Sequence, residues 1–175
     1  MIVKANAVKS KRALCRAIDY ILSEGKAAVK AVRNLFGTED FALQIEEISK
    51  LWGKTSGRLG YHFIFSFDPK DDVTNALALR VVNKIIHEMF PNHQAILAVH
   101  NDTDHIHIHA VMGAIDPLSG RKVNLRNQSY AKLKDKANEI CVEFGLSPFD
   151  WREAVRRKRQ EERLGEYPEQ YCFAE

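Results

Sequence analysis

The chain has 175 residues, of which 45% are hydrophobic and 28% charged, and its formal net charge is +3. These values are typical of a soluble globular protein with one domain of ordinary size. No apolar run approaches the roughly 18 residues that a membrane helix needs, and the N-terminus has no signal-peptide pattern. We therefore expect a cytoplasmic protein that makes no membrane contact. The cysteines, Cys15, Cys141 and Cys172, are far apart without CxxC spacing and are expected to be free thiols.

The apolar pattern predicts strands and helices mixed along the chain. In chain order we expect an edge strand at 1–7, helices at 10–22 and 38–52, a strand at 61–67, a helix at 74–90, strands at 94–100 and 106–114, a short strand at 121–125 and a helix at 128–144.

The strands at 94–100 and 106–114 are separated by a short polar turn, which predicts a β-hairpin. Helices mixed with a sequential hairpin favour an α+β fold, an antiparallel β-sheet with flanking helices, over a parallel doubly wound sheet. We assign residues 1–148 to this domain. Residues 149–175 are rich in charge and are expected to form a helical or flexible C-terminal tail.

Basic side chains concentrate near both ends of the sequence. One cluster lies on and just before the helix expected at 10–22, and the other spans Arg156–Arg159. Such clusters are compatible with phosphate binding and equally with solvated surfaces that bind nothing. The candidate phosphate contacts are Lys4, Lys11, Arg12, Arg16, Arg121, Lys122 and Arg126.

Four of the seven histidines lie between residues 100 and 109. Alternate residues of a strand share a face, so His107 and His109 point the same way. His100 ends the preceding strand and pairs across the hairpin, where Cβ atoms come within about 5 Å. Three imidazoles can therefore converge on a divalent ion, either manganese, magnesium, zinc or nickel, and leave positions open for water or a phosphate oxygen.

Other polar residues of the same segment are candidates to support this site. Asp102 and Asp104 are suited to orient the histidine rings, and His105 has the same strand parity as His107. Two simpler interpretations stay open, namely exposed strand histidines and a metal site without catalysis.

The segment from His100 to His109, followed by the apolar run 110–113, resembles the histidine-hydrophobe-histidine motif of HUH endonucleases. More narrowly, it resembles the relaxases of mobilisable plasmids and integrative elements, the MobP class. The segment 61–69 is similar to that family's second motif, and 116–122 to the turn after its histidine strand. Residues 16–22 resemble, more weakly, the first motif, which carries a nucleophilic tyrosine.

The resemblance spans roughly residues 1–148 and implies an HUH endonuclease-like fold. Relaxases cut one DNA strand at an origin of transfer, through a tyrosine that stays linked to the 5′ phosphate. The implied partners are single-stranded DNA, an accessory DNA-binding protein and a coupling ATPase. Relaxases are often longer, and whether this chain is part of a longer one stays open.

The resemblance makes Tyr20 the candidate nucleophile, because it ends a basic helix and lies beside the apolar stripe rather than in it. Tyr61 is expected in the core, and Tyr130 is the second candidate. His62 is a candidate contact of the scissile phosphate or an ordinary strand histidine. His87 and His93 are expected at the surface.

Three other functions stay open. A rolling-circle replication initiator shares the histidine motif but usually places its tyrosine after the histidines, as Tyr130 is placed. A catalytically inactive DNA-binding module would use the metal only for stability. A metal hydrolase of small molecules would use a water nucleophile.

Overall fold

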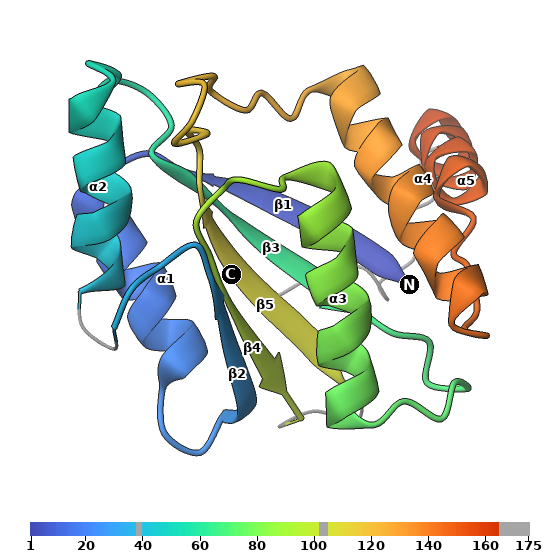
Figure 1. Ribbon diagram of the computed structural model, residues 1–175. Helices are drawn as coiled ribbons and strands as arrows, with labels where there is room; N and C mark the ends of the chain where they lie inside the picture. Colours follow the sequence, from blue (N-terminus) through green and yellow to red (C-terminus); the bar gives the residue numbers. More distant parts are fainter. Residues whose placement is uncertain (38–39, 102–104, 165–175) are drawn as a thin grey trace.

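The computed structural model describes residues 1–37, 40–101 and 105–164. A five-stranded antiparallel sheet with the order β1-β3-β5-β4-β2 forms its centre (Figure 1). This confirms the predicted α+β class. The elements are β1 (Ile2–Val8), α1 (Lys11–Leu22), β2 (Ala27–Arg33), α2 (Phe41–Leu51), β3 (Gly60–Ser66), α3 (Asn75–Met89), β4 (Ala95–His100), β5 (His107–Gly113), α4 (Asn127–Glu143) and α5 (Trp151–Leu164).

Helices cover both faces of the sheet, and two separate cores result. Helices α1 and α2 pack on one face, where Leu14 and Ile45 contact the side chains of Ile96 and Val111. Helices α3 and α4 pack on the other face over a larger core that includes Phe63. Both faces of β4 are covered, which is why its six residues are all buried and why its sequence is almost continuously apolar.

Strand alternation decides which side chains meet α1 and α2. In β3, Tyr61, Phe63 and Phe65 face α3 and α4. His62 therefore faces the opposite way, as do the partner positions in β4 and β5 with the same parity. The face under α1 and α2 consequently receives the histidines of three adjacent strands.

The sequence analysis missed β2. This edge strand pairs only with β4, starts with Ala27 opposite His100, and has a register shift before Val29. Its sequence, AAVKAVR, combines alanine and lysine, which have low strand propensity, with several exposed positions. The strand expected at 121–125 is reduced to one isolated bridge between Ile115 and Lys122.

Helix α1 begins and ends where its sequence predicts. Ser10 caps the start by accepting a hydrogen bond from the Ala13 amide. At the other end, Gly25 adopts a left-handed φ of 79° that lets the chain turn back into β2. Leu14, Ile18 and Ile21 are the buried stripe.

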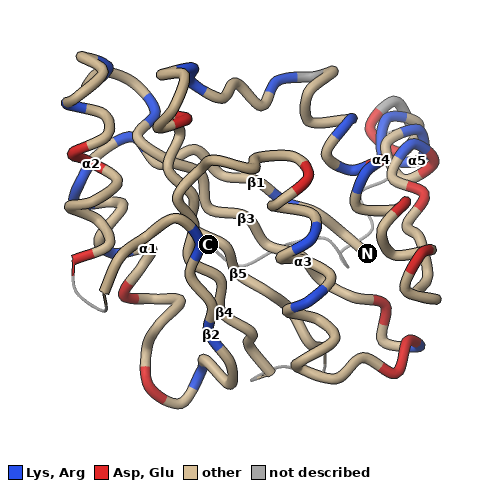
Figure 2. Tube along the Cα trace, in the orientation of Figure 1, with Lys and Arg blue, Asp and Glu red and all other residues tan. Residues whose placement is uncertain are grey.

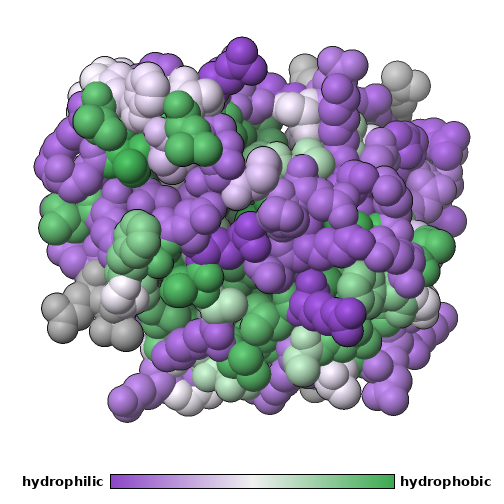
Figure 3. Space-filling model, viewed as in Figure 1, coloured by the Kyte–Doolittle hydropathy of each residue, from purple (hydrophilic) through white to green (hydrophobic). Residues whose placement is uncertain are grey.

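Helix α5 packs beside α4, with the Trp151 indole donating to the Asp135 carboxylate at 3.0 Å. The boundary at 148/149 and the separate character of the tail remain predictions. Within the described ranges, no helix is both long and apolar enough to cross a membrane. The face shown in Figure 3 is largely hydrophilic, with hydrophobic patches that include one at the upper left, where Figure 1 places α2.

The expectation that His93 lies at the surface is wrong. Only 6% of this residue is exposed, and its ring packs edge-on against that of Phe90, with the two ring centroids 5.7 Å apart. Neither ring nitrogen has a hydrogen-bond partner among the described residues. Spacing along the chain does not predict this burial, because it depends on how the turn between α3 and β4 packs against the rest of the molecule, as in the hydrogen bond from Asn34 to the His93 carbonyl. Burial lowers the pKa of His93 below the ordinary 6.5, against an opposing effect of Asp116.

We predict that His93 makes stability depend on pH. The unfolded chain takes up a proton on this residue as the pH falls below 6.5. In the folded chain His93 resists protonation. Its contribution to the free energy of unfolding is therefore fully present above that pH and declines below it. His93→Leu should flatten the decline by up to about 1.4 kcal/mol per pH unit, in urea unfolding between about pH 5.5 and 7.5. Leu133→Ala, which changes core packing but leaves the contact between His93 and Phe90 in place, should lower the free energy of unfolding equally at both ends of this pH range. An unchanged slope in His93→Leu would contradict the prediction.

Candidate active site

Three histidine side chains meet at one end of the β4–β5 pair. The register places His100 directly opposite His107, and His109 follows on the same face. Ring centroids are 4.5 Å apart for His100 and His109, and 5.0 Å apart for His107 and His109. One nitrogen from each residue lies within 4.8 Å of the other two. We call these residues the histidine triad, and their convergence is what strand parity predicted.

Backbone carbonyls determine which nitrogen of two of these rings carries a proton. His100 Nε2 donates to the Ile21 carbonyl at 3.0 Å, so its lone pair is on Nδ1. That Nδ1 is buried and has no hydrogen-bond partner in the described part of the chain. His107 Nδ1 donates to the His105 carbonyl at 3.2 Å, which leaves its lone pair on Nε2. A carbonyl can only accept, so each contact selects one tautomer.

The third ring is oriented by a fourth histidine. His62 Nε2 and His109 Nδ1 lie 2.8 Å apart. His109 Nε2 is buried without a partner among the described residues. If His109 donates from Nδ1, its unpartnered Nε2 carries a lone pair. The opposite tautomer would bury an unsatisfied N–H, which costs about 1–3 kcal/mol. His62 thus supports His109, a function that the sequence did not reveal.

Burial and neighbouring positive charge favour the neutral forms of His109 and His62. Burial lowers the pKa of His109 to about 3, with further lowering by His62, His100, His107 and Lys26. Burial and then His100 also lower the pKa of His62. Neutral imidazole is the form that binds a metal.

The triad fits a divalent transition metal. Its buried lone pairs on His100 Nδ1 and His109 Nε2 have no protein partner in the described ranges. Three imidazole nitrogens suit nickel or zinc better than magnesium, which prefers oxygen. With three protein ligands, an ion keeps positions open for other molecules.

Three other residues were expected to support the metal, and the structure describes one of them. Asp102 and Asp104 lie outside the described residues. His105 is exposed and supports the triad through its carbonyl, which accepts from His107.

Tyr20 lies against the histidine triad. Its ring centroid is 5.4 Å from that of His109, with the rings perpendicular, and 5.9 Å from that of His100. The residue is 44% exposed, so its phenol is open to solvent. The ammonium group of Lys26 lies 4.5 Å from the ring centroid, a contact that contributes about 0.5–1 kcal/mol at such sites. Tyr20 is therefore both exposed to solvent and close to the triad.

The other described tyrosines lie in the core on the opposite face of the sheet. Tyr61 is buried and donates to the Val123 carbonyl at 3.3 Å, as expected for a core residue. Tyr130 projects from α4 and donates to the Val3 carbonyl at 2.7 Å. Tyr167 and Tyr171 lie outside the described residues.

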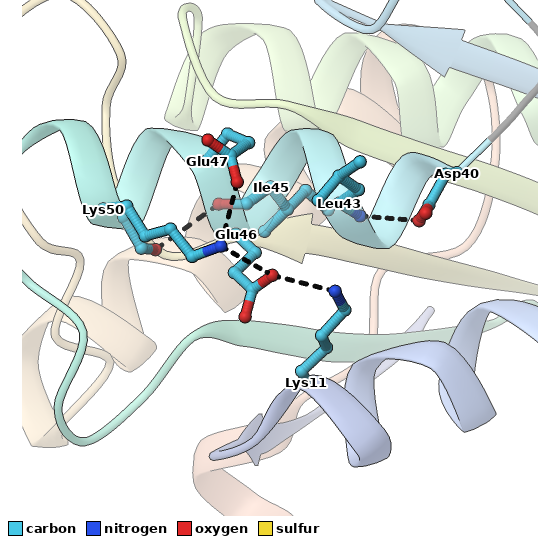
Figure 4. A network of polar contacts seen from close by, with 8 residues as sticks. Lys11, Asp40, Leu43, Ile45, Glu46, Glu47 and Lys50 are labelled. Carbon is cyan, nitrogen blue, oxygen red and sulfur yellow. Dashed lines mark hydrogen bonds and ion pairs between the residues drawn. The ribbon is translucent and has the colours of Figure 1, made fainter.

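Some of the basic residues lie close to Tyr20 along α1. Arg12 and Arg16 are exposed and precede Tyr20 by two turns and one turn of this helix. Lys11 is engaged elsewhere, because its ammonium pairs with Glu46 of α2 at 3.0 Å (Figure 4). The same carboxylate oxygen pairs with Lys50 at 3.3 Å, so the network links α1 to α2.

Three further basic candidates lie at the opposite end of the sheet, whereas Lys4 lies in β1 opposite Ile64. Arg121, Lys122 and Arg126 follow the Gly113 end of β5, whereas the triad occupies its His107 end. Lys122 donates to the carbonyls of Lys54 and Ser56. Lysine and arginine are scattered over many elements (Figure 2). The structure does not bring these three side chains to the triad, and their contact with DNA remains a prediction.

We predict that the triad binds a divalent transition metal. His100→Ala and His109→Ala should each weaken Mn²⁺ or Ni²⁺ binding by more than about 100-fold, since each variant deletes a donor. Isothermal titration calorimetry measures the affinity. His87→Ala, on the exposed side of α3, is the matched control and should bind as the wild type does. Wild-type affinity in both triad variants would exclude this metal site.

We predict a smaller effect for His62. His62→Ala should weaken metal binding by about 10- to 100-fold, because His109 loses the acceptor that orients it. In His62→Gln the side-chain oxygen can accept from His109 Nδ1, so this variant should bind nearly as well as the wild type. Equal affinity in His62→Ala and the wild type would show that the hydrogen bond does not support the metal site.

Comparison with known proteins identifies the family. The model of the relaxase family, MobA/VirD2-like nuclease domain, matches residues 20–146. Two Staphylococcus aureus proteins called Protein rlx are 34% identical over 144 residues and 32% identical over 136 residues. These matches cover 80% and 75% of this chain, which spans 41% of each relative.

A solved structure has the same fold. It was reported as the molecular basis of vancomycin resistance transfer in Staphylococcus aureus, and it superimposes with a TM-score of 0.55 at 8% sequence identity. The match covers 86% of this chain and 98% of that chain. The family match begins at Tyr20 and contains the whole histidine triad. The chain thus belongs to the relaxase family, as a MobA/VirD2-like nuclease domain.

Proposed function

We propose that this chain nicks one strand of origin-of-transfer DNA during conjugative mobilisation, with Tyr20 as the nucleophile. The observation that carries the proposal is the position of the exposed Tyr20 ring, whose centroid lies 5.4 Å from that of His109. His109 belongs to the triad, whose buried lone pairs fit a metal. Relaxase family membership and the similarity to the Protein rlx sequences support it.

The reaction is a transesterification. The Tyr20 oxygen forms a bond to the scissile phosphorus, and the bond from phosphorus to the 3′ oxygen breaks. The phenolic proton passes to solvent, and the leaving 3′ oxygen takes up a proton to become a hydroxyl. The products are a 5′-phosphotyrosine and a free 3′ end, and because the phosphodiester bond energy is conserved, religation is the same step in reverse.

Each neighbouring residue has a separate contribution to this step. His100, His107 and His109 would hold a divalent ion, which would supply positive charge to stabilise the phosphoryl oxygens. His62 and the Ile21 carbonyl hold two triad rings in their ligand tautomers. The exposed Arg12 and Arg16 offer phosphate contacts along α1, on the way to Tyr20.

The proposed partners follow from the same family. They are single-stranded DNA at an origin of transfer, an accessory DNA-binding protein and a coupling ATPase. The reaction needs no membrane contact.

The structure weakens the replication-initiator alternative. That arrangement needs a tyrosine after the histidines, and Tyr130 is the described residue that meets this condition. Its hydroxyl donates a hydrogen bond to the Val3 carbonyl, and its helix packs on the face of the sheet opposite the triad. The inactive-module alternative predicts a metal-dependent melting temperature but no covalent product.

We predict a covalent protein–DNA adduct whose formation depends on Tyr20. Wild-type protein, Mn²⁺ and labelled oligonucleotides covering the origin of transfer should give a shifted band on a denaturing gel. Tyr20→Phe should reduce the adduct by at least roughly 1,000-fold, and His107→Ala should also abolish it.

Tyr130→Phe is the matched control, since it also removes one phenol, and it should retain the adduct. Loss of the adduct in Tyr130→Phe but not in Tyr20→Phe would reverse the assignment of the nucleophile. Cleavage without any adduct would indicate a water nucleophile.

A further inference from the structure

Lys26 lies beside Tyr20, although neither its sequence context nor the family motif singled it out. Its Nζ atom is 4.5 Å from the centroid of the Tyr20 ring, and the residue is half-buried. Its positive charge also reaches His109, where it contributes to the lowering of the pKa. Lys26 is therefore next to both the proposed nucleophile and the triad.

The backbone holds Lys26 in this place. Gly25 turns the chain with a φ of 79°, and the Lys26 amide donates to the Ser23 carbonyl at 3.3 Å. The next residue, Ala27, is already paired with His100 in the sheet. The start of β2 therefore fixes the backbone of Lys26 close to the triad.

Within the described ranges Lys26 forms no ion pair, unlike Lys11 and Lys50, which share the carboxylate of Glu46. Imidazole is an uncharged ligand, so a divalent ion bound at the triad would keep its full charge. Two positive charges close together repel each other, and an anion between them removes the repulsion.

We propose that Lys26 binds a non-bridging oxygen of the scissile phosphate beside Tyr20. This proposal rests on the proposed nicking function and adds a substrate-contacting residue to it. An ammonium group in this position neutralises phosphate charge as the Tyr20 oxygen approaches, and its contact with the ring also holds the nucleophile over the triad.

The first test compares rates of adduct formation. Lys26→Ala should slow the reaction by about 100-fold, which is the scale of losing one positioned donor, and Lys26→Arg should restore most of the rate. Lys30→Ala is the matched control, because it removes the same charge from β2, the strand that begins directly after Lys26. The Lys30 ammonium instead donates to the Leu22 carbonyl at 3.2 Å. Equal slowing in Lys26→Ala and Lys30→Ala would overturn the proposal, as would a wild-type rate in Lys26→Ala.

The second test neutralises the phosphate. An oligonucleotide with a methylphosphonate at the scissile position lacks one non-bridging oxygen charge. If Lys26 contacts that oxygen, the defect of Lys26→Ala should shrink to less than about 10-fold with one of the two diastereomers. An undiminished defect with both diastereomers would contradict the contact.

The third test separates this role from support of the triad. Calorimetric titration of Lys26→Ala with Mn²⁺ in the absence of DNA should show an affinity equal to or higher than that of the wild type, because a repulsive charge is gone. Weaker binding would overturn the proposal and make Lys26 a support for the triad.

The outcomes also distinguish the two proposals. If Tyr20→Phe abolishes the adduct and Lys26→Ala leaves it unchanged, the nicking function stands and only the role of Lys26 fails. If the wild type forms no adduct, both proposals fail.

Discussion

The antiparallel pairing of β4 with β5 is the constraint on which the rest of the site depends. It places His100 opposite His107, and alternation then puts His109 on the same face. A shift of one residue in this register would turn the β5 side chains to the other face and separate the triad. The flanking pairs of β5 with β3 and of β4 with β2 bring His62 and the start of β2 to the same place.

Burial of the paired histidines determines which of their nitrogens need a partner. His100 is fully buried, so its ring nitrogens need partners. One nitrogen is satisfied by the Ile21 carbonyl, and the other is left to a ligand from outside the chain. The same division between a protein partner and an external ligand holds for His109. A metal would thus complete a hydrogen-bonding pattern that the fold leaves incomplete.

The parts of the site that follow local rules could be predicted from the sequence. Strand parity and a short hairpin suffice to bring His107 and His109 to His100, and a helical pattern suffices to leave Tyr20 beside the buried stripe. The contact between His62 and His109 depends on the order of strands in the sheet, which spacing along the chain does not reveal. Lys26 was missed with β2, because an edge strand of alanines and lysines has almost no pattern. The buried position of His93 depends in the same way on loops that meet only in three dimensions.

The C-terminal end of α1 meets three different hydrogen-bond donors. The carbonyls of Tyr20, Ile21 and Leu22 accept from Ser23, His100 and Lys30, respectively. These carbonyls form the negative pole of the helix macrodipole, which attracts cations and repels anions. The helix that carries Tyr20 would by itself push a phosphate away from it. For the proposed nicking reaction, the positive charges of Lys26 and of a metal bound at the triad would have to outweigh this pole, so metal binding would favour substrate binding as well as the chemistry.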